Sequence, residues 1–129
     1  MNNGLMAAST SDPQKIQAES ARKRFQNPSL AMIELTQDGS VRQLSPAARN
    51  LLEYSAADDV SESFFSMIHG RQLYQVMRDV ADMVCHGKTR ATWLVRMRTA
   101  RGRWKWFKAD VYNRLDQAAH ALEIVIVAV

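Results

Sequence analysis

Residues that could hold a metal ion are few and scattered. The 129-residue chain has three histidines and one cysteine, and His69, His86 and His120 fall in different segments. Cys85 and His86 are adjacent, so on a helix their side chains point about 100° apart and cannot easily share one ion. The sequence therefore predicts no metal site. One cysteine also cannot form an intramolecular disulfide, so nothing indicates an oxidising compartment.

Catalytic patterns are not found either. The sequence contains no glycine-rich phosphate loop and no nucleophile elbow. Asp58 and Asp59 are adjacent acids in a polar connector, where carboxylates are usually solvated. We therefore expect no catalytic residue and no enzyme. A small isomerase on a related α+β fold is a weaker alternative, since no general base is placed in a cavity.

The densest chemical pattern is RTARGRWKWFK, residues 98–108. It interleaves cations with aromatic rings, which is typical of surfaces where single-stranded bases stack on rings and cations meet phosphates. The net charge is only +4, and acidic residues elsewhere dilute the positive field. We therefore keep a single-stranded nucleic-acid module using hairpin 96–108 as the alternative function, beside the simpler interpretation of a solvated hairpin.

The N-terminal region predicts a tail and a helix. Residues 1–11 are small and polar and are expected to be disordered. An Asp-Pro start at residues 12–13 supplies a capping acceptor and a proline at the first helical position, so a helix is predicted over 12–27. Its apolar content is thin, with Ile16 and Phe25 among the few apolar side chains. Such a helix should lie against another surface.

The next segment predicts a hairpin and short helices. Strands over 30–35 and 41–44 flank an Asp38-Gly39 turn, and Ser45-Pro46 starts a short helix. Gly70 is expected to interrupt the chain after one further helical turn. The short helix is expected to bury Ala48, Leu51 and Leu52.

The C-terminal half changes period. Residues 71–86 carry an apolar stripe at helical spacing that should face a core, and Gly87 should cap this helix. The stripe consists of Leu73, Val76, Met77, Val80 and Val84. Strands are then predicted over 89–99, 103–115 and 119–129, forming an antiparallel meander. Separate runs of helices and strands indicate an α+β fold.

The meander and the long helix enclose a predicted interior. Inward positions of the first meander strand face the helix stripe, as in an apolar pocket for a small molecule. A filled hydrophobic core is the simpler interpretation of the same residues. The candidate pocket residues are Leu73, Met77, Val80, Trp93, Val95, Met97 and Phe107.

The turn at Arg101-Gly102 decides where two tryptophans point. A two-residue turn would put Trp106 on the face of Met97. A three-residue loop with a left-handed Gly102 would instead turn Phe107, Ala109 and Val111 toward Met97, Val95 and Trp93. We favour the second register, which exposes both tryptophans beside Arg96 and Arg98. The exposed rings should then be covered by the N-terminal helix or a second subunit, so the predicted dimer surface comprises Ile16, Phe25, Trp104 and Trp106.

Residues 28–129 resemble the PAS family in element order and in three motifs. LTQDGSVRQLSPAARNLLEYS resembles the first hairpin and helix, SFFSMIHGRQL the entry to the long helix, and VRMRTARGRWKWFKADV the subfamily hairpin of the type "R.r..DG..rW". Gly70 and Arg71 replace the usual Pro and Asp, and Arg101 replaces the Asp before the hairpin glycine. These departures weaken the match to one subfamily more than the match to the fold.

The resemblance implies a five-stranded antiparallel sheet of order 2-1-5-4-3, with its helices on one face. It implies a sensory or interaction domain of a sensor kinase, a cyclic-dinucleotide enzyme or a transcription regulator, which binds a small ligand or a partner. It further implies a homodimer and an effector domain or signalling partner.

The same resemblance predicts which cofactors are absent, and the sequence itself predicts the location. Haem-binding relatives use a histidine on the long helix, whereas His69 precedes it and His86 ends it, so haem is not expected. The photosensory subfamily carries an Asn-Cys-Arg-Phe type motif that this chain lacks, so flavin is not expected. The start has no secretory signal, and the apolar stretch 121–129 is shorter than the roughly 20 residues of a membrane span. We expect a cytoplasmic protein that does not contact a membrane.

Overall fold

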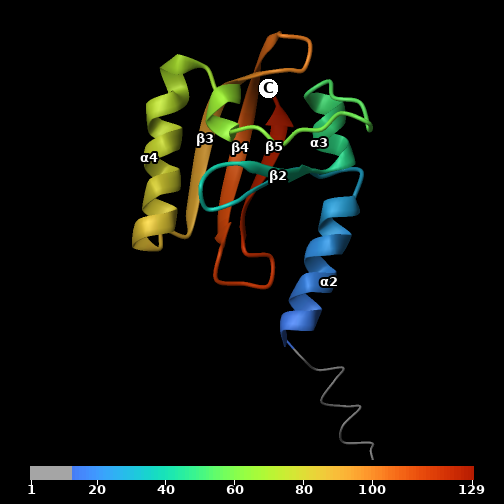
Figure 1. The fold of residues 1–129 in the computed structure, drawn as a ribbon, viewed down its shortest axis with the longest axis vertical. Helices are drawn as coiled ribbons and strands as arrows, with labels where there is room; N and C mark the ends of the chain where they lie inside the picture. Colours follow the sequence, from blue (N-terminus) through green and yellow to red (C-terminus); the bar gives the residue numbers. More distant parts are fainter. Residues whose placement is uncertain (1–12) are drawn as a thin grey trace, which may run out of the picture.

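The fold is a twisted antiparallel sheet with the helices between residues 46 and 86 packed on one of its faces (Figure 1). The computed structural model describes residues 13–129, and the sheet order is β2-β1-β5-β4-β3. The strands are β1 (Ala31–Leu35), β2 (Val41–Leu44), β3 (Arg90–Arg98), β4 (Trp104–Arg114) and β5 (Ala121–Ala128). The helices are α2 (Pro13–Gln26), α3 (Pro46–Leu51), the 3-10 turn η1 (Phe64–Met67) and α4 (Gly70–His86). The α+β class and the predicted order are confirmed, whereas the predicted disorder over 1–11 and the Asp12 cap lie outside the described residues.

Local turn chemistry explains the first hairpin and α3. Gly39 has a φ of +86°, and a Cβ there would lie 2.5 Å from the Phe65 ring, so glycine is required for two reasons. Ser45 caps α3 by accepting a hydrogen bond from the Ala48 N–H, as predicted. Ala48 and Leu52 are buried, and Leu51 is half-buried.

Helix α4 starts one residue earlier than expected and turns a different face toward the sheet. Gly70 does not interrupt the chain but is the first helical residue, because the His69 ring caps the helix by accepting from the Arg71 N–H at 3.1 Å. Gly87 ends the helix with a φ of +71°, as predicted. The expectation that Met77 and Val84 face the core is wrong, since both are exposed.

The reason is the narrow contact between α4 and the sheet. Val76, Val80 and Met83 are spaced by four and three residues and are all buried. Met77 lies about 100° around the helix from Val76, which places it beyond the edge of this contact. Hydrophobic spacing alone could not decide which edge of a broad stripe meets the sheet.

The β3–β4 hairpin has the favoured three-residue loop. The Thr99 N–H donates to the Arg103 carbonyl at 2.8 Å, and Gly102 has a φ of +80°. Val95 pairs with Phe107, Trp93 with Ala109 and Ala91 with Val111. The predicted faces are therefore confirmed, but each predicted pair is displaced by two residues, because the Thr99–Arg103 closure sets the register.

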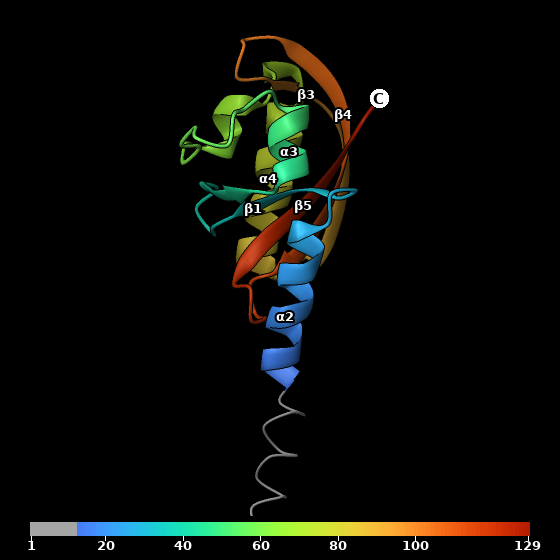
Figure 2. The ribbon, with the colours of Figure 1, turned by 90° about the vertical axis from the view of Figure 1, so that its right-hand side faces the viewer.

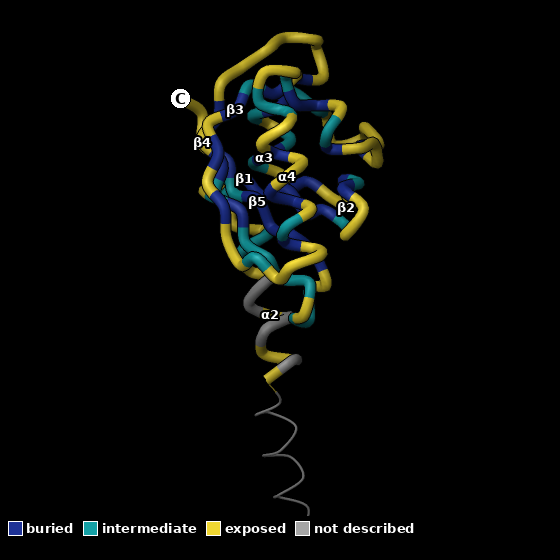
Figure 3. The backbone as a smooth tube through the Cα atoms, turned by 90° about the vertical axis from the view of Figure 1, so that its left-hand side faces the viewer, coloured by how far each residue is buried: buried dark blue, intermediate teal, exposed yellow. Residues whose placement is uncertain are grey.

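Burial distinguishes the sheet from the segments that extend beyond it. Figure 3 shows the buried backbone concentrated in the sheet, whereas the β3–β4 hairpin loop is exposed. Helix α2 extends away from the sheet at the end opposite that hairpin (Figures 1 and 2). The N-terminal helix therefore does not cover the outer face near Trp104 and Trp106 of its own chain.

Candidate interaction surface on the outer face of the sheet

The interior between α4 and the sheet is filled by side chains. Of the seven predicted pocket residues, Leu73 is half-buried and Met77 is 46% exposed, so Met77 does not line the interior. The Trp93 ring stacks on Phe64 at 6.2 Å between centroids. The other five pack in the core: Val80, Trp93, Val95, Met97 and Phe107. This packing favours the filled-core interpretation, and ligand binding by these residues stays a prediction.

One buried carboxylate fixes this interior. Asp79 accepts hydrogen bonds from Trp93 Nε1 at 2.8 Å and from Lys88 Nζ at 2.9 Å. Burial alone would raise the pKa of Asp79, but these two bonds outweigh it and hold the pKa below its usual value. Asp79 therefore stays ionised and ties α4 to β3.

The outer face of the sheet has two contrasting ends. We define the carboxylate end by Glu34, Arg42, Arg114 and Glu123, which lie near the β4–β5 loop. We define the tryptophan end by Leu94, Arg96, Trp104, Trp106, Lys108, Val127 and Val129, which lie toward the β3–β4 hairpin.

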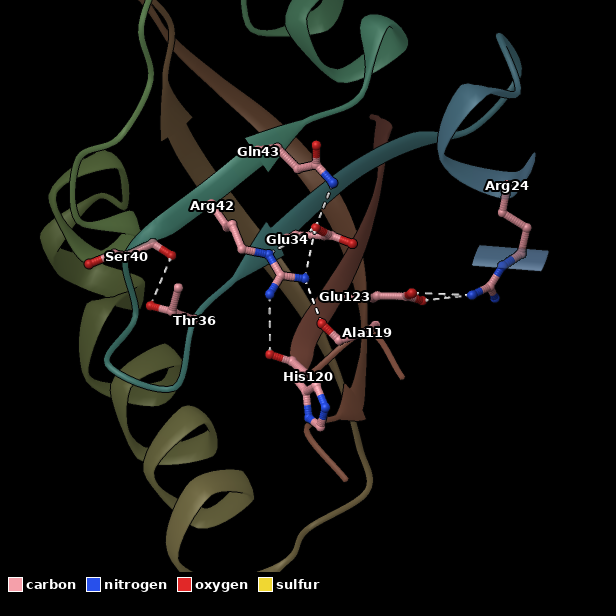
Figure 4. A network of polar contacts seen from close by, with 9 residues as sticks. All are labelled: Arg24, Glu34, Thr36, Ser40, Arg42, Gln43, Ala119, His120 and Glu123. Atoms are coloured by element: carbon pink, nitrogen blue, oxygen red, sulfur yellow. Dashed lines mark hydrogen bonds and ion pairs between the residues drawn. The ribbon is translucent and has the colours of Figure 1, made fainter. Parts of the chain in front are cut away.

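At the carboxylate end, two buried acids are register partners on neighbouring strands. Glu34 of β1 pairs with Glu123 of β5, and both are buried. Like charges directly opposite on a sheet destabilise it, so each acid needs cations or amide donors. Glu34 accepts from Arg42 Nη2 at 3.1 Å and from Gln43 Nε2 at 2.7 Å (Figure 4).

Glu123 is neutralised from two elements. Arg114 of β4 donates to it at 3.2 Å, and Arg24 of α2 donates to both of its oxygens at 3.2 Å. Figure 4 shows the Arg24 side chain reaching from the helix to this carboxylate. Helix α2 is therefore held on the sheet by an ion pair at its C-terminal turn.

A groove lies beside this ion pair. Its volume is about 550 Å³. It is lined by Arg22, Phe25, Gln26, Glu34, Arg42, Gln43, Ala118, Ala119 and His120. Phe25, predicted to lie at a dimer surface, thus faces this groove, whereas Ile16 is exposed on α2.

At the tryptophan end, large apolar side chains remain exposed on three neighbouring strands. Leu94, Trp104, Trp106, Val127 and Val129 are each between 43% and 79% exposed. The sheet register places them side by side: Lys108 pairs with Leu94 on one side and with Val127 on the other. Val129 joins the patch through its N–H, which donates to the Trp106 carbonyl at 3.2 Å.

Both tryptophans are held in place by a neighbouring ring or cation. The Arg96 guanidinium lies 4.9 Å over the Trp106 ring, a cation–π contact. The His69 ring contacts Trp104 edge-on at 5.0 Å. Partial burial, followed by the nearby Arg96 and Arg71 charges, lowers the pKa of His69, so the contact is made by a neutral ring at pH 7.

The two cations of the tryptophan end, Arg96 and Lys108, have no carboxylate within 4.0 Å in the part of the chain that the structure describes. Arg98, the next outward residue of β3, forms a salt bridge with Glu62 at 3.8 Å.

Two other cations of hairpin 96–108 point elsewhere. Arg103 and Lys105 both pair with Glu53, which lies two residues after the end of α3. Hydrogen bonds from Arg103 and Thr99 lower the pKa of Glu53 to about 2. The basic track suggested by the sequence is therefore divided between the two faces of the hairpin.

Sequence reasoning identified both tryptophans but missed their aliphatic neighbours. Leu94 stood out as the one apolar side chain among the outward positions of β3, which was a usable signal. Val127 and Val129 gave none, because the C-terminal segment is apolar on both faces. Cys85 is exposed. Among residues 13–129, no three potential ligands are arranged to hold a metal ion, and no helix is long and apolar enough to cross a membrane.

Comparisons with known proteins agree with this architecture. A family model described as the PAS fold matches residues 41–128. The chain belongs to the PAS family. No curated protein sequence matches it.

Solved structures with low sequence identity share the fold. A domain of a sensory box sensor histidine kinase/response regulator from Geobacter sulfurreducens has a TM-score of 0.68 at 12% identity, covering 90% of this chain and 97% of that one. The PAS-B domain of Drosophila melanogaster Cycle, solved with bound ethylene glycol, has a TM-score of 0.64 at 12% identity, covering 77% and 99%. A LOV protein of Rhodobacter sphaeroides has a TM-score of 0.69 at 14% identity, covering 89% and 68%.

Proposed function

We propose that this chain is a non-catalytic sensory and protein-interaction domain of a signal-transduction protein. The observation that carries the proposal is the tryptophan end, an apolar and cationic surface left open on a rigid sheet. Monomeric proteins rarely expose contiguous apolar patches without a function, and aromatic and arginine side chains are enriched where partners bind. Membership of the PAS family supports a signalling role.

A partner protein fits this geometry better than an internal small ligand. The interior is occupied by Trp93 and Phe64, so a ligand would have to displace packed side chains. The tryptophan end needs no rearrangement to be contacted, because His69 and Arg96 already hold its rings.

We further propose that two copies associate through α2. The helix extends beyond the sheet and exposes Ile16, so it has surface for a second chain. Light scattering on the full chain and on residues 28–129 tests this: a monomeric shorter form supports the role of α2, and equal dimerisation of both forms contradicts it.

The docking role is tested by a two-hybrid screen with a matched control. Partners found with the wild type should be lost with Trp106→Ala and kept with Tyr74→Ala, which removes an exposed aromatic from α4. If Trp106→Ala keeps every partner, the tryptophan end is not the docking surface. Native mass spectrometry of the purified wild-type chain checks separately whether a small molecule co-purifies.

Single-stranded nucleic acid is the second candidate, because two exposed tryptophans lie beside Arg96 and Lys108. Binding of a poly-dT oligonucleotide should then weaken steeply with salt. The absence of such a salt dependence would exclude this function.

A further inference from the structure

We infer that the tryptophan end takes an acidic amphipathic helix of a partner protein. This inference rests on the proposed docking function and adds the chemistry of the occupant. The apolar side chains come from three neighbouring strands, which span about 10 Å, close to the diameter of an α-helix with side chains. Leu94 to Arg98 on β3 extends about 14 Å along the strand, so the surface accommodates roughly three turns of a helix.

The apolar part of the surface suits a helix with one apolar stripe. Trp104 and Trp106 form an aromatic ridge along the middle strand β4, Val127 and Val129 form an aliphatic side next to it, and Leu94 lies on β3 across Lys108. Helices that dock in this way present apolar anchors at positions i, i+3, i+4 and i+7. The rings and aliphatic side chains stand on sheet backbone, so little order is lost on binding.

The charge of the surface selects an acidic partner. Arg96 and Lys108 point out from the same face with no carboxylate within 4.0 Å among the described residues, whereas Arg98 on this face is paired with Glu62 at 3.8 Å. Asp110 lies one row from Lys108 and accepts from Thr92 at 3.0 Å. The Arg96 guanidinium is pre-positioned over the Trp106 ring, with Nε toward Gln72 Oε1 at 3.4 Å. Carboxylates flanking an apolar stripe would meet these cations with favourable electrostatic complementarity.

A second copy of the chain fits the charge poorly. Two tryptophan ends placed face to face would bring Arg96 and Lys108 against like charges. Helix α2 of another copy is itself basic, since Lys15, Arg22, Lys23 and Arg24 outnumber Glu19. Either contact would place like charges beside Arg96 and Lys108, which disfavours association at the tryptophan end.

Nucleic acid also fits less well than an acidic helix. The Arg96 guanidinium covers the Trp106 ring on which a base would stack. Arg103 and Lys105 are paired with Glu53, which shortens the cationic track for phosphates. Three aliphatic side chains occupy the positions where further stacking rings would be needed.

The test is selection from a displayed library of 18-residue helical peptides. Every member carries the same Leu and Phe stripe, and the flanking positions are randomised. Selection on the wild-type chain should enrich Asp and Glu at those positions, and the selected peptides should bind more weakly as salt increases. Lys108→Glu should reverse the preference toward Lys and Arg at one flanking position.

Loss variants and controls complete the design. Trp106→Ala and Leu94→Glu, each made alone, should weaken the binding of a selected peptide at least about tenfold. Circular dichroism and thermal unfolding check that each variant is folded. As controls on α4, away from the tryptophan end, Tyr74→Ala removes an aromatic ring and Arg78→Glu reverses a charge. Both variants should keep the wild-type affinity for the peptide.

The outcomes separate this inference from the proposed function. Peptides that need Trp106 but show no acidic preference would overturn the inference and leave the docking surface intact. Peptides unaffected by Trp106→Ala and Leu94→Glu would overturn both. A dimer of the wild type that is lost in Leu94→Glu, or poly-dT binding that is lost in Trp106→Ala, would replace the acidic helix by a second copy or by nucleic acid.

Discussion

The two ends of the outer sheet face use similar residues with opposite results. Both ends contain arginines beside rings or acids, and both include side chains of β4 and β5. At the carboxylate end each buried acid has partners, and α2 contributes Arg24 to the pairing. At the tryptophan end Arg96 and Lys108 have no acidic partner among the described residues, and large apolar side chains remain exposed. A cluster whose charged groups pair with one another stabilises the fold, whereas unpaired cations beside exposed apolar side chains are available to another molecule.

The largest effect on stability is expected from breaking the carboxylate end. Arg114→Met leaves the buried Glu123 with Arg24 alone, beside Glu34. An incompletely paired buried charge is costly, so the free energy of unfolding should fall by about 2–3 kcal/mol in urea titrations. The double variant Arg114→Met/Glu123→Met should recover most of this loss. An unchanged midpoint in the single variant would show that Arg114 does not stabilise the acid.

A smaller, local effect is expected where α2 meets this end. Arg24→Ala removes two hydrogen bonds to the buried Glu123, but Arg114 stays paired with this acid and Arg24 itself is partly exposed. The free energy of unfolding should therefore fall by about 1–2 kcal/mol. The helix, however, should open more often. Hydrogen exchange should accelerate in residues 13–26, with α4 amides as the internal control. Equal exchange in α2 of both proteins would mean that other contacts hold the helix.

The ion pairs of Glu53 with Arg103 and Lys105, here called the Glu53 clamp, should make the free energy of unfolding depend on pH in the acidic range. The folded-state pKa of Glu53 is lowered from 4.5 to about 2. Its stabilising contribution is therefore present above pH 4.5 and is lost as pH falls from about 4.5 toward 2. Glu53→Gln should remove this part of the pH dependence of the unfolding midpoint, whereas Glu19→Gln on α2 should keep it. Identical pH profiles for wild type and Glu53→Gln would refute the clamp.

The smallest effect on stability is expected at the tryptophan end itself. Lys108→Glu changes an exposed side chain that has no acidic partner in the described part of the chain, so the free energy of unfolding should change by no more than about 0.5 kcal/mol. Calorimetry of the variant beside Arg114→Met would compare the two ends directly. A loss approaching that of Arg114→Met would show that the tryptophan end is structural rather than a docking surface.

The sequence predicted those features of the fold that depend on residues close together in the chain. The left-handed glycines, the Ser45 cap, the alternation of β3 and the outward tryptophans depend on residues within a few positions of one another, so their short-range chemistry was readable. Motif order over residues 28–129 supplied the family and, through it, the sheet order.

The candidate site was readable only in part. Trp104 and Trp106 could be placed by hairpin register, but their joining with Val127 and Val129 required the pairing of β4 with β5. The wrong orientation of Met77 and the position of Phe25 at the groove have a similar origin. Each depends on which neighbour meets a helix, and the apolar stripe of α4 is too broad, and that of α2 too thin, to specify this contact.

By itself the sequence determined the elements, their caps and turns, and the alternation that sends charges outward, because these follow from backbone geometry and side-chain period. Tertiary structure alone decided that Glu34 faces Glu123 and pairs with Arg42, that Arg24 ties α2 to the sheet, and that Lys108 has no acidic partner among residues 13–129. Charges far apart in the chain interact only after the strands have paired, so their balance is a property of the folded sheet.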